Sequence, residues 1–292
     1  MTTLKSSGSN KNNKIICLRP ESDFEEFGEV APSHFNVIYL SPSDRSLIRK
    51  ASDASVLLIP AVGPKISNDI FSKTSLKMVQ VTGAGIDRLD QDFCARNNIK
   101  VCNVLGASAK SVAEYCIFAA LTISRRLSKT TDEILLGNYK ELRGNIIQDR
   151  MFSLSGLTLG VIGFGSIGQE TAKMFSALGC QIQYYDPSDP KVAENLSQIA
   201  VKNGKEELLR TSDIISIHVP LIDQTKNLIS MQEFSLMKKT SILLNASRGG
   251  VVDEHALSQA IQDKKIKGAA IDVFTSEPSE KNNPLLNLSD EF

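Results

Sequence analysis

Short apolar runs alternate with segments of helical spacing between Lys14 and Asn103. The runs IICL, FNVIYL, ASVLLIP, LKMVQV and IKVCNV are rich in β-branched residues and have the length of buried strands. The segments between them, at 43–52, 67–73 and 90–97, show helical spacing or begin with Asp or Ser. Such alternation predicts a parallel sheet covered by helices. We therefore expect a first, smaller α/β domain of the flavodoxin-like type over residues 14–106.

The alternation continues in the second half of the chain, residues 107–292. Ser108 to Arg126 has a wide apolar face and predicts a long helix, whose Arg-Arg end suits the negative end of the helix dipole. Residues 127–155 are more polar and predict a helix and a loop. Six strands then predict an α/β domain with a complete Rossmann doubly wound parallel sheet. The strands are expected at 159–162, 182–185, weakly near Ile199, and at 213–219, 241–246 and 268–273; the helices beyond 186 are expected at 204–210, 231–237 and 253–263.

The first two of these strands enclose a G-x-G-x-x-G turn and a helix. Gly163 permits a tight turn, Gly165 lets the backbone approach a pyrophosphate, and Gly168 allows close packing of helix on strand. The phosphates would lie at the helix N-terminus, where free N–H groups favour an anion. Asp186 ends the second strand, where a carboxylate would accept hydrogen bonds from the adenosine ribose and repel a 2′-phosphate. The context favours NAD binding over an ordinary glycine-rich turn.

A second glycine pair follows the strand LKMVQV, in the segment Thr82 to Asp87. Two glycines at the carboxyl end of a parallel strand expose backbone N–H groups at the edge where α/β folds bind ligands. A small carboxylate could be held there, although the spacing is equally typical of a plain β-α turn.

The composition excludes several classes of partner. The 292 residues carry 33 basic and 33 acidic side chains, so no charge surplus indicates nucleic acid or an acidic membrane surface. The polar start lacks a secretory signal, and no stretch of about 18 apolar residues predicts a membrane span. We expect residues 1–13 to be a disordered tail, and the protein to be cytoplasmic, with import into an organelle as the alternative location. The five cysteines are scattered, and we expect them to be buried, reduced thiols. No metal site is predicted.

Three charged residues come just past the ends of strands in the second domain. Arg248 follows the run ILLNAS, Asp272 ends GAAID, and Glu277 lies five residues further on. A guanidinium pairs with the carboxylate of an oxo acid and polarises its carbonyl, and a carboxylate can orient a histidine. A structural ion pair is the alternative use of these residues. The three histidines do not supply an evident general acid: His34 is in the first domain, and His218 and His255 are not placed opposite Arg248.

Four blocks together resemble one family. GVIGFGSIG, HVPL, LLNASRGGVVDEHAL and GAAIDVFTSEP occur in that order, as in the D-isomer-specific 2-hydroxyacid dehydrogenases, the group of phosphoglycerate dehydrogenase and glyoxylate/hydroxypyruvate reductase. The resemblance runs from about Lys14 to the end. It implies an oxidoreductase that transfers hydride between NAD(H) and a small D-2-hydroxy acid or 2-oxo acid. It also implies a homodimer through the second domain, with the helix at 108–126 as candidate contact.

The resemblance assigns roles to individual positions. The 14–106 domain would bind substrate, whose carboxylate would meet Ala84 and Gly85. Arg248 would polarise the substrate, and Glu277 would pair with a catalytic histidine. The cofactor would contact Gly163, Gly165, Ser166, Ile167, Gly168, Asp186, Pro220, Thr225, Ala246, Ser247 and Asp272.

The sequence departs from the family pattern at its end. The family's catalytic histidine lies in a Pro-His segment beyond the glutamate and is followed by a helix, whereas this sequence stops at Phe292, before both. We expect a C-terminally truncated dehydrogenase; the alternatives are a catalytically impaired NAD-binding scaffold or regulatory pseudoenzyme, and another residue that supplies the proton. Because Pro60 to Gly63 contains no arginine to meet a phosphate, a small acid such as glyoxylate or hydroxypyruvate is favoured over 3-phosphoglycerate.

Overall fold

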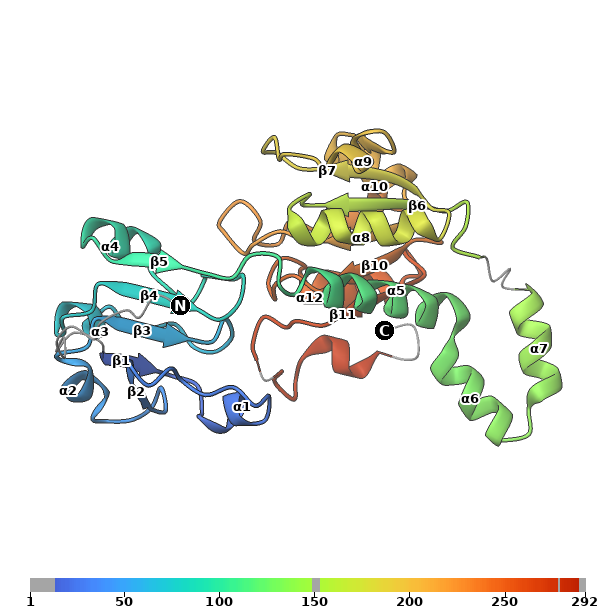
Figure 1. Cartoon of the computed structure of the whole chain (residues 1–292). Coiled ribbons are helices and arrows are strands. Elements are labelled where there is room, and N and C mark those ends of the chain that lie inside the picture. Colours follow the sequence, from blue (N-terminus) through green and yellow to red (C-terminus); the bar gives the residue numbers. More distant parts are fainter. Residues whose placement is uncertain (1–13, 149–152, 278, 289–292) are drawn as a thin grey trace, which may run out of the picture. The chain divides into compact units, whose positions relative to one another are not determined.

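The chain forms two units of the α/β class, each built on a parallel sheet. The structure is a computed structural model that describes residues 14–148, 153–277 and 279–288 (Figure 1). The first unit ends at Ala107 and the second begins at Ser108. The expected α/β fold with two parallel sheets is confirmed, and the predicted tail over 1–13 lies outside the described residues.

The first unit contains a five-stranded sheet in the order β2-β1-β3-β4-β5, with every pairing parallel. Each strand coincides with one of the predicted apolar runs. The elements are β1 (Lys14–Cys17), α1 (Ser22–Glu25), β2 (Asn36–Tyr39), α2 (Leu47–Ala51), β3 (Val56–Ile59), α3 (Asp69–Ser72), β4 (Met78–Val81), α4 (Gln91–Arg96) and β5 (Lys100–Cys102).

Local hydrogen bonds decide where the short helices of the first unit begin. The Asp90 carboxylate accepts the Phe93 amide at 2.8 Å and so caps α4 where the sequence predicted. The helix predicted over 43–52 begins later, at Leu47, because the Asp44 carboxylate accepts the Ser46 amide at 2.7 Å and holds a turn before it. The single turn α1 was not predicted.

The second unit contains a six-stranded parallel sheet in the order β11-β10-β9-β6-β7-β8. The sheet order reverses at β6, which pairs with β7 on one side and β9 on the other. The predicted weak strand near Ile199 is confirmed as β8. From residue 158 onward, the elements are β6 (Thr158–Ile162), α8 (Ser166–Ala177), β7 (Gln181–Tyr185), α9 (Glu194–Ser197), β8 (Ala200–Lys202), α10 (Lys205–Thr211), β9 (Ile214–Ile217), α11 (Met231–Leu236), β10 (Ile242–Asn245), α12 (Glu254–Gln262), β11 (Gly268–Ile271) and the 3-10 helix η1 (Pro284–Asn287).

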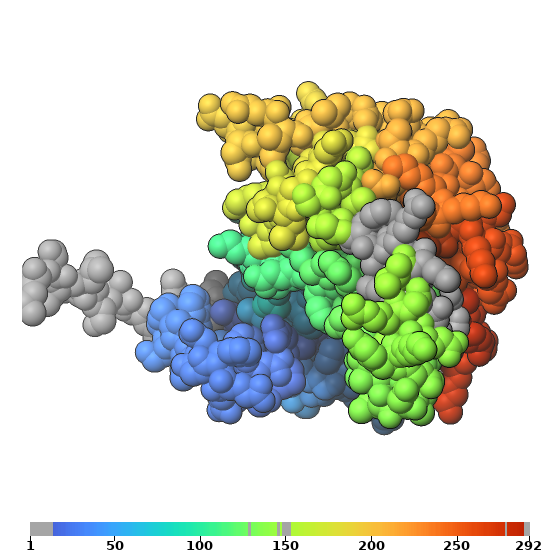
Figure 2. All heavy atoms as spheres, turned by 90° about the vertical axis from the view of Figure 1, so that its right-hand side faces the viewer, coloured from blue at the N-terminus to red at the C-terminus, as the bar shows by residue number. Residues whose placement is uncertain are grey.

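Two segments of the second unit differ from expectation. The predicted helix and loop after α5 (Ala109–Arg125) are instead two helices, α6 (Leu127–Leu135) and α7 (Tyr139–Gln148). Figure 1 shows both helices extending from the end of α5 away from the sheet, and in Figure 2 their green spheres stand out on the surface. The polar tail contains η1, which was not predicted, and its Leu285 is fully buried in the core.

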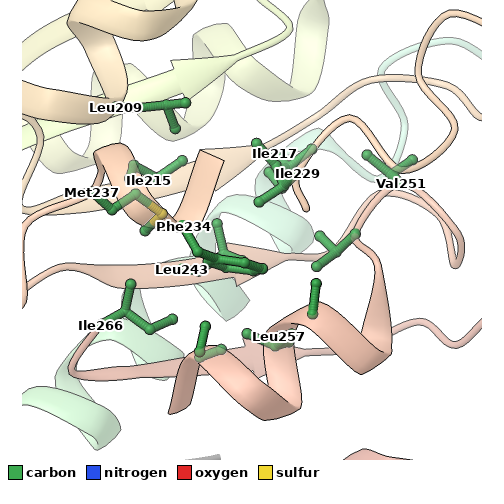
Figure 3. Close-up of a cluster of buried hydrophobic side chains, with 14 of the residues drawn as sticks. Leu209, Ile215, Ile217, Ile229, Phe234, Met237, Leu243, Val251, Leu257 and Ile266 are labelled. Carbon is green, nitrogen blue, oxygen red and sulfur yellow. The ribbon is translucent and has the colours of Figure 1, made fainter. Parts of the chain in front are cut away.

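Apolar clusters cover both faces of the six-stranded sheet. On one face, α10, α11 and α12 bury side chains such as Leu209, Phe234 and Leu257 against Leu243 of β10 (Figure 3). The other cluster joins α5 and α8 to the sheet. Leu243 is fully buried, so its truncation to alanine would cost about 2–5 kcal/mol of unfolding free energy. This packing fixes the carboxyl ends of the strands, where the candidate site residues lie.

None of the helices in the described ranges is both long and apolar enough to cross a membrane.

Candidate active site

The three glycines of the 163–168 turn differ in what surrounds them. Gly163 has φ +90°, and a Cβ there would lie 2.5 Å from the His218 carbonyl oxygen. A Cβ on Gly168 would lie 2.1 Å from the Gly163 carbonyl oxygen, so the helix packs directly on the turn. A Cβ on Gly165 would meet no atom within 4 Å. The protein's own packing therefore needs the first and third glycines, whereas space beside the second remains open to a ligand.

The open space lies at the start of a three-turn helix. Gly165 is the N-cap of α8 and has no side chain with which to satisfy the first N–H groups, which belong to Ser166 and the residues that follow. Those N–H groups and the positive end of the dipole favour an anion. A pyrophosphate fits both the space and the charge.

Asp186 lies next to this turn. Its Oδ2 accepts the Phe164 amide at 2.8 Å, and its Oδ1 accepts the Ser188 amide at 2.9 Å and the Ser188 hydroxyl at 2.6 Å. These bonds orient a half-buried carboxylate at the carboxyl end of β7 and leave part of its acceptor capacity for a hydroxyl group.

Asn245 shapes the turn that carries Arg248. Asn245 is the last residue of β10, and its side chain is buried. The side-chain oxygen accepts hydrogen bonds from the Ser247 amide at 3.1 Å and the Ser247 hydroxyl at 2.7 Å, and the side-chain nitrogen donates to the Arg248 carbonyl oxygen at 3.2 Å. The half-buried Arg248 donates through Nη1 to the Ser247 carbonyl oxygen at 2.8 Å. Ala246 is half-buried beside them. Sequence reasoning missed Asn245, although a polar residue that ends a fully apolar strand was a usable signal.

The segment after β11 lies against the Arg248 turn. A Cβ on Gly249 would be 1.9 Å from the Phe274 carbonyl oxygen, so only glycine permits this approach. Glu277 accepts the Phe274 amide at 3.1 Å through Oε1. Partial burial and the neighbouring Glu277 charge raise the pKa of Asp272. Arg248, Asp272 and Glu277 thus lie on two contacting segments at the same edge of the sheet.

The loop after β9 carries His218, Pro220 and Thr225. The Thr225 hydroxyl accepts the Ile222 amide at 2.9 Å and donates to the Pro220 carbonyl oxygen, which closes the loop. His218 Nε2 lies 2.8 Å from the Ser216 hydroxyl, and its buried Nδ1 has no partner among the described residues. Burial lowers the pKa of His218 to about 4. This imidazole is neutral at pH 7, which does not suit a cationic general acid.

In the first unit, Ala84 and Gly85 are half-buried in the loop after β4. Asn103 Nδ2 donates to the Ala84 carbonyl oxygen at 2.7 Å, which fixes this loop against the end of β5. A Cβ on Gly83 would lie 2.6 Å from Ala61 Cβ, so the loop also packs on the one that follows β3.

Arg88 contacts the loop that contains Pro60 to Gly63, a segment that itself contains no arginine. Its side chain is 3% exposed and donates to the Pro60 carbonyl oxygen at 2.6 Å and to the Pro64 carbonyl oxygen at 2.9 Å. Burial lowers the pKa of Arg88. The buried guanidinium therefore holds the loop through its carbonyl groups and does not face solvent. Sequence reasoning missed it because Arg88 is 24 and 28 residues from its partners.

Sequence comparison assigns this arrangement to a family. Residues 117–291 match the NAD binding domain of the D-isomer specific 2-hydroxyacid dehydrogenases. The chain belongs to that family. The matched range includes the glycine turn, Asp186, Arg248 and Glu277, and the resemblance inferred from the four sequence blocks is confirmed.

Individual relatives are named for activity on different 2-hydroxy or 2-oxo acids. The chain is 37% identical to D-3-phosphoglycerate dehydrogenase of Methanocaldococcus jannaschii, over 90% of this chain and 48% of that protein, so it spans about half of that relative's length. It is 36% identical to glyoxylate reductase of Aeropyrum pernix, over 85% of this chain and 74% of that protein. The structure of D-lactate dehydrogenase from Aquifex aeolicus with NAD and lactic acid matches 96% of this chain and 86% of that one, with a TM-score of 0.78 and 28% identity.

Proposed function

We propose that this member of the family is an NAD-dependent D-2-hydroxyacid dehydrogenase that transfers hydride between NAD(H) and a small 2-hydroxy acid or 2-oxo acid. The observation that carries the proposal is the open space at Gly165, at an uncapped helix N-terminus and beside the oriented Asp186 carboxylate. The strand order of the second unit is that of a Rossmann sheet, and residues 107–292 would form the NAD-binding domain. Asp186 would accept the ribose hydroxyls and repel a 2′-phosphate, so NAD is preferred.

The remaining residues of the second unit take roles at the reactive end of the cofactor. Bound nicotinamide supplies the hydride donor or acceptor. Ala246, Ser247 and Asp272 would contact the nicotinamide half, and Pro220 and Thr225 would line the cofactor cleft. Arg248 would hold the substrate carboxylate and polarise its carbonyl. Glu277 would orient the histidine that exchanges the hydroxyl proton.

The first unit would bind the substrate, with residues 14–106 as its domain. Its strand order is that of flavodoxin-like sheets, in which ligands bind at the carboxyl ends of the strands. Ala84 and Gly85 would offer backbone N–H groups to the substrate carboxylate. The one arginine that contacts Pro60 within this part of the described chain, Arg88, is buried, which favours an unphosphorylated acid such as glyoxylate or hydroxypyruvate.

A pair of assays tests the function. Titration with NADH, followed by its fluorescence, measures cofactor binding in a chain without tryptophan. Oxidation of NADH with a panel of 2-oxo acids then measures turnover. Binding with turnover supports the dehydrogenase, and binding without turnover supports the alternative, an NAD-binding scaffold or regulatory pseudoenzyme. Absence of NADH binding would exclude both. A higher turnover in the oxidative direction with 3-phosphoglycerate than with a small unphosphorylated 2-hydroxy acid would reverse the substrate preference.

We also infer a cytoplasmic homodimer that forms through α5, α6 and α7. Large apolar side chains on or directly after these helices are exposed, among them Phe118 (63%) of α5, Leu135 (80%) at the end of α6 and Leu136 (72%), which follows it. Apolar patches of this kind usually mark an association surface.

A further inference from the structure

Gln169 joins two loops that are distant in sequence. It lies on α8, one turn after Gly165, and its Nε2 donates to the Phe164 carbonyl oxygen at 2.9 Å and to the Lys191 carbonyl oxygen at 3.0 Å. Its Oε1 accepts the Ala193 amide at 3.0 Å. A single half-buried amide thus fastens the far end of the 186–193 loop to the glycine turn.

The near end of the 186–193 loop is fastened to the same residue of the glycine turn. The Phe164 amide donates to Asp186 Oδ2 at 2.8 Å, while its carbonyl oxygen accepts from Gln169. The Phe164 ring is fully buried and stacks on Tyr184, with ring centroids 3.9 Å apart. Phe164 is therefore a fixed anchor, and the loop is closed between Asp186 at one end and Gln169 at the other.

We propose that Gln169 is a positioning residue for cofactor selectivity: it holds the 186–193 loop so that Asp186 meets an unmodified ribose and a 2′-phosphate is refused. The inference rests on the proposed function, because it assumes that Asp186 receives the adenosine ribose. When the loop is already ordered before the cofactor binds, the binding free energy is not reduced by the entropy lost in ordering it. Without Gln169, NADH binding would have to order the loop, and the NADH dissociation constant would rise.

The surroundings of Gln169 explain why the two cofactors would respond differently. An open pocket of about 550 Å³ lies beside it and is lined by Gly165, Ser166, Lys173 and Lys191, among others. While the loop is closed, the Lys191 backbone is fixed by Gln169. In a loosened loop, Lys191 can turn toward a 2′-phosphate and offset the repulsion from Asp186. Loss of Gln169 should therefore weaken NADH binding and spare NADPH binding.

The test compares Gln169→Met with the unsubstituted chain. Methionine keeps the length and helix propensity of glutamine but removes all three hydrogen bonds. Dissociation constants for NADH and NADPH are measured separately by titration of nucleotide fluorescence. The matched control is Gln259→Met, the same substitution at an exposed position of α12, where the glutamine side chain donates to Asp263 Oδ1 at 2.9 Å. Amide hydrogen exchange of residues 187–193 in the unliganded proteins gives a second measurement that needs no cofactor.

For Gln169→Met we expect the NADH dissociation constant to rise about tenfold, the NADPH constant to change by less than about twofold, and loop exchange to accelerate. For Gln259→Met we expect both constants within about twofold of the unsubstituted chain. An unchanged NADPH-to-NADH ratio in Gln169→Met would overturn the inference, whether both constants stay the same or rise together. If Gln169→Met does not fold, rapid exchange of the Ala193 amide in the unsubstituted chain would overturn it. Failure of the unsubstituted chain to bind NADH would instead refute the proposed function, and this inference with it.

Discussion

Alanine substitutions at the three glycines of the 163–168 turn should separate folding from cofactor binding. At Gly165 the added methyl group meets no protein atom within 4 Å, and the backbone φ of −73° is ordinary for alanine. Alanine is a poorer N-cap residue than glycine, which lowers the unfolding free energy, but it also reduces the conformational entropy of the unfolded chain, which raises it. These two effects nearly cancel, so the unfolding free energy should change by less than about 1 kcal/mol. In the proposed complex with NADH, the same methyl group would lie in the space assigned to the pyrophosphate. That overlap should cost about 1–3 kcal/mol and raise the NADH dissociation constant about 10- to 100-fold.

Gly168→Ala should do the opposite. Its methyl group would lie 2.1 Å from the Gly163 carbonyl oxygen, a backbone atom that can move only if α8 shifts. We expect a loss of about 2–4 kcal/mol in unfolding free energy. Gly163→Ala combines a clash at 2.5 Å with positive φ and should be at least as destabilising. Urea unfolding measures stability, and NADH titration of the folded fraction measures binding. If Gly165→Ala destabilised the protein as much as Gly168→Ala, or bound NADH normally, the assignment of the open space to the cofactor would be wrong.

Four further predictions follow from the site and its supports. Arg248→Lys should lower kcat/KM for 2-oxo acids about 100-fold and leave NADH affinity unchanged, because lysine cannot pair bidentately with a carboxylate; a parallel loss of NADH affinity in titrations would contradict this role. Because burial lowers the pKa of His218 to about 4, the unfolded chain binds the extra proton and stability should fall as pH drops from about 6.5 to 4, by up to about 3 kcal/mol. Urea unfolding of His218→Gln over the same pH range should show a correspondingly smaller slope, and an equal slope would refute the assignment. Arg88→Met should remove the hydrogen bonds to the Pro60 and Pro64 carbonyl oxygens, lower the unfolding free energy by about 1–3 kcal/mol and speed proteolysis within 60–64. The NADH affinity should stay unchanged and serves as the control. Replacing Leu135 and Leu136 together by lysine should convert a dimer into a monomer by light scattering, and an unsubstituted chain of monomeric mass would exclude the dimer.

The sequence alone determined the elements whose signals are local. The apolar runs predicted the buried strands of both sheets, because a buried parallel strand is apolar on both faces. The exposed edge strand β8 was predicted only weakly, near Ile199. The spacing of Gly163, Gly165 and Gly168 and the acid at Asp186 lie within one β-α-β unit, so their consequences could be worked out from neighbouring residues. The α6 and α7 pair was harder, since amphipathic helices with exposed apolar residues carry the same polar composition as a loop.

The tertiary structure decided which polar side chains support the site. Gln169 bonds residues 22 and 24 positions away, and Arg88 reaches back 24 and 28 positions to the loop after β3. Such contacts depend on how loops from different β-α units fold beside one another, and no periodicity in the sequence records that arrangement. The strands and glycines, which can be recognised in the sequence, therefore determined which edge of each sheet is available to a ligand. The packing of the loops determined which side chains hold the residues of that edge in position.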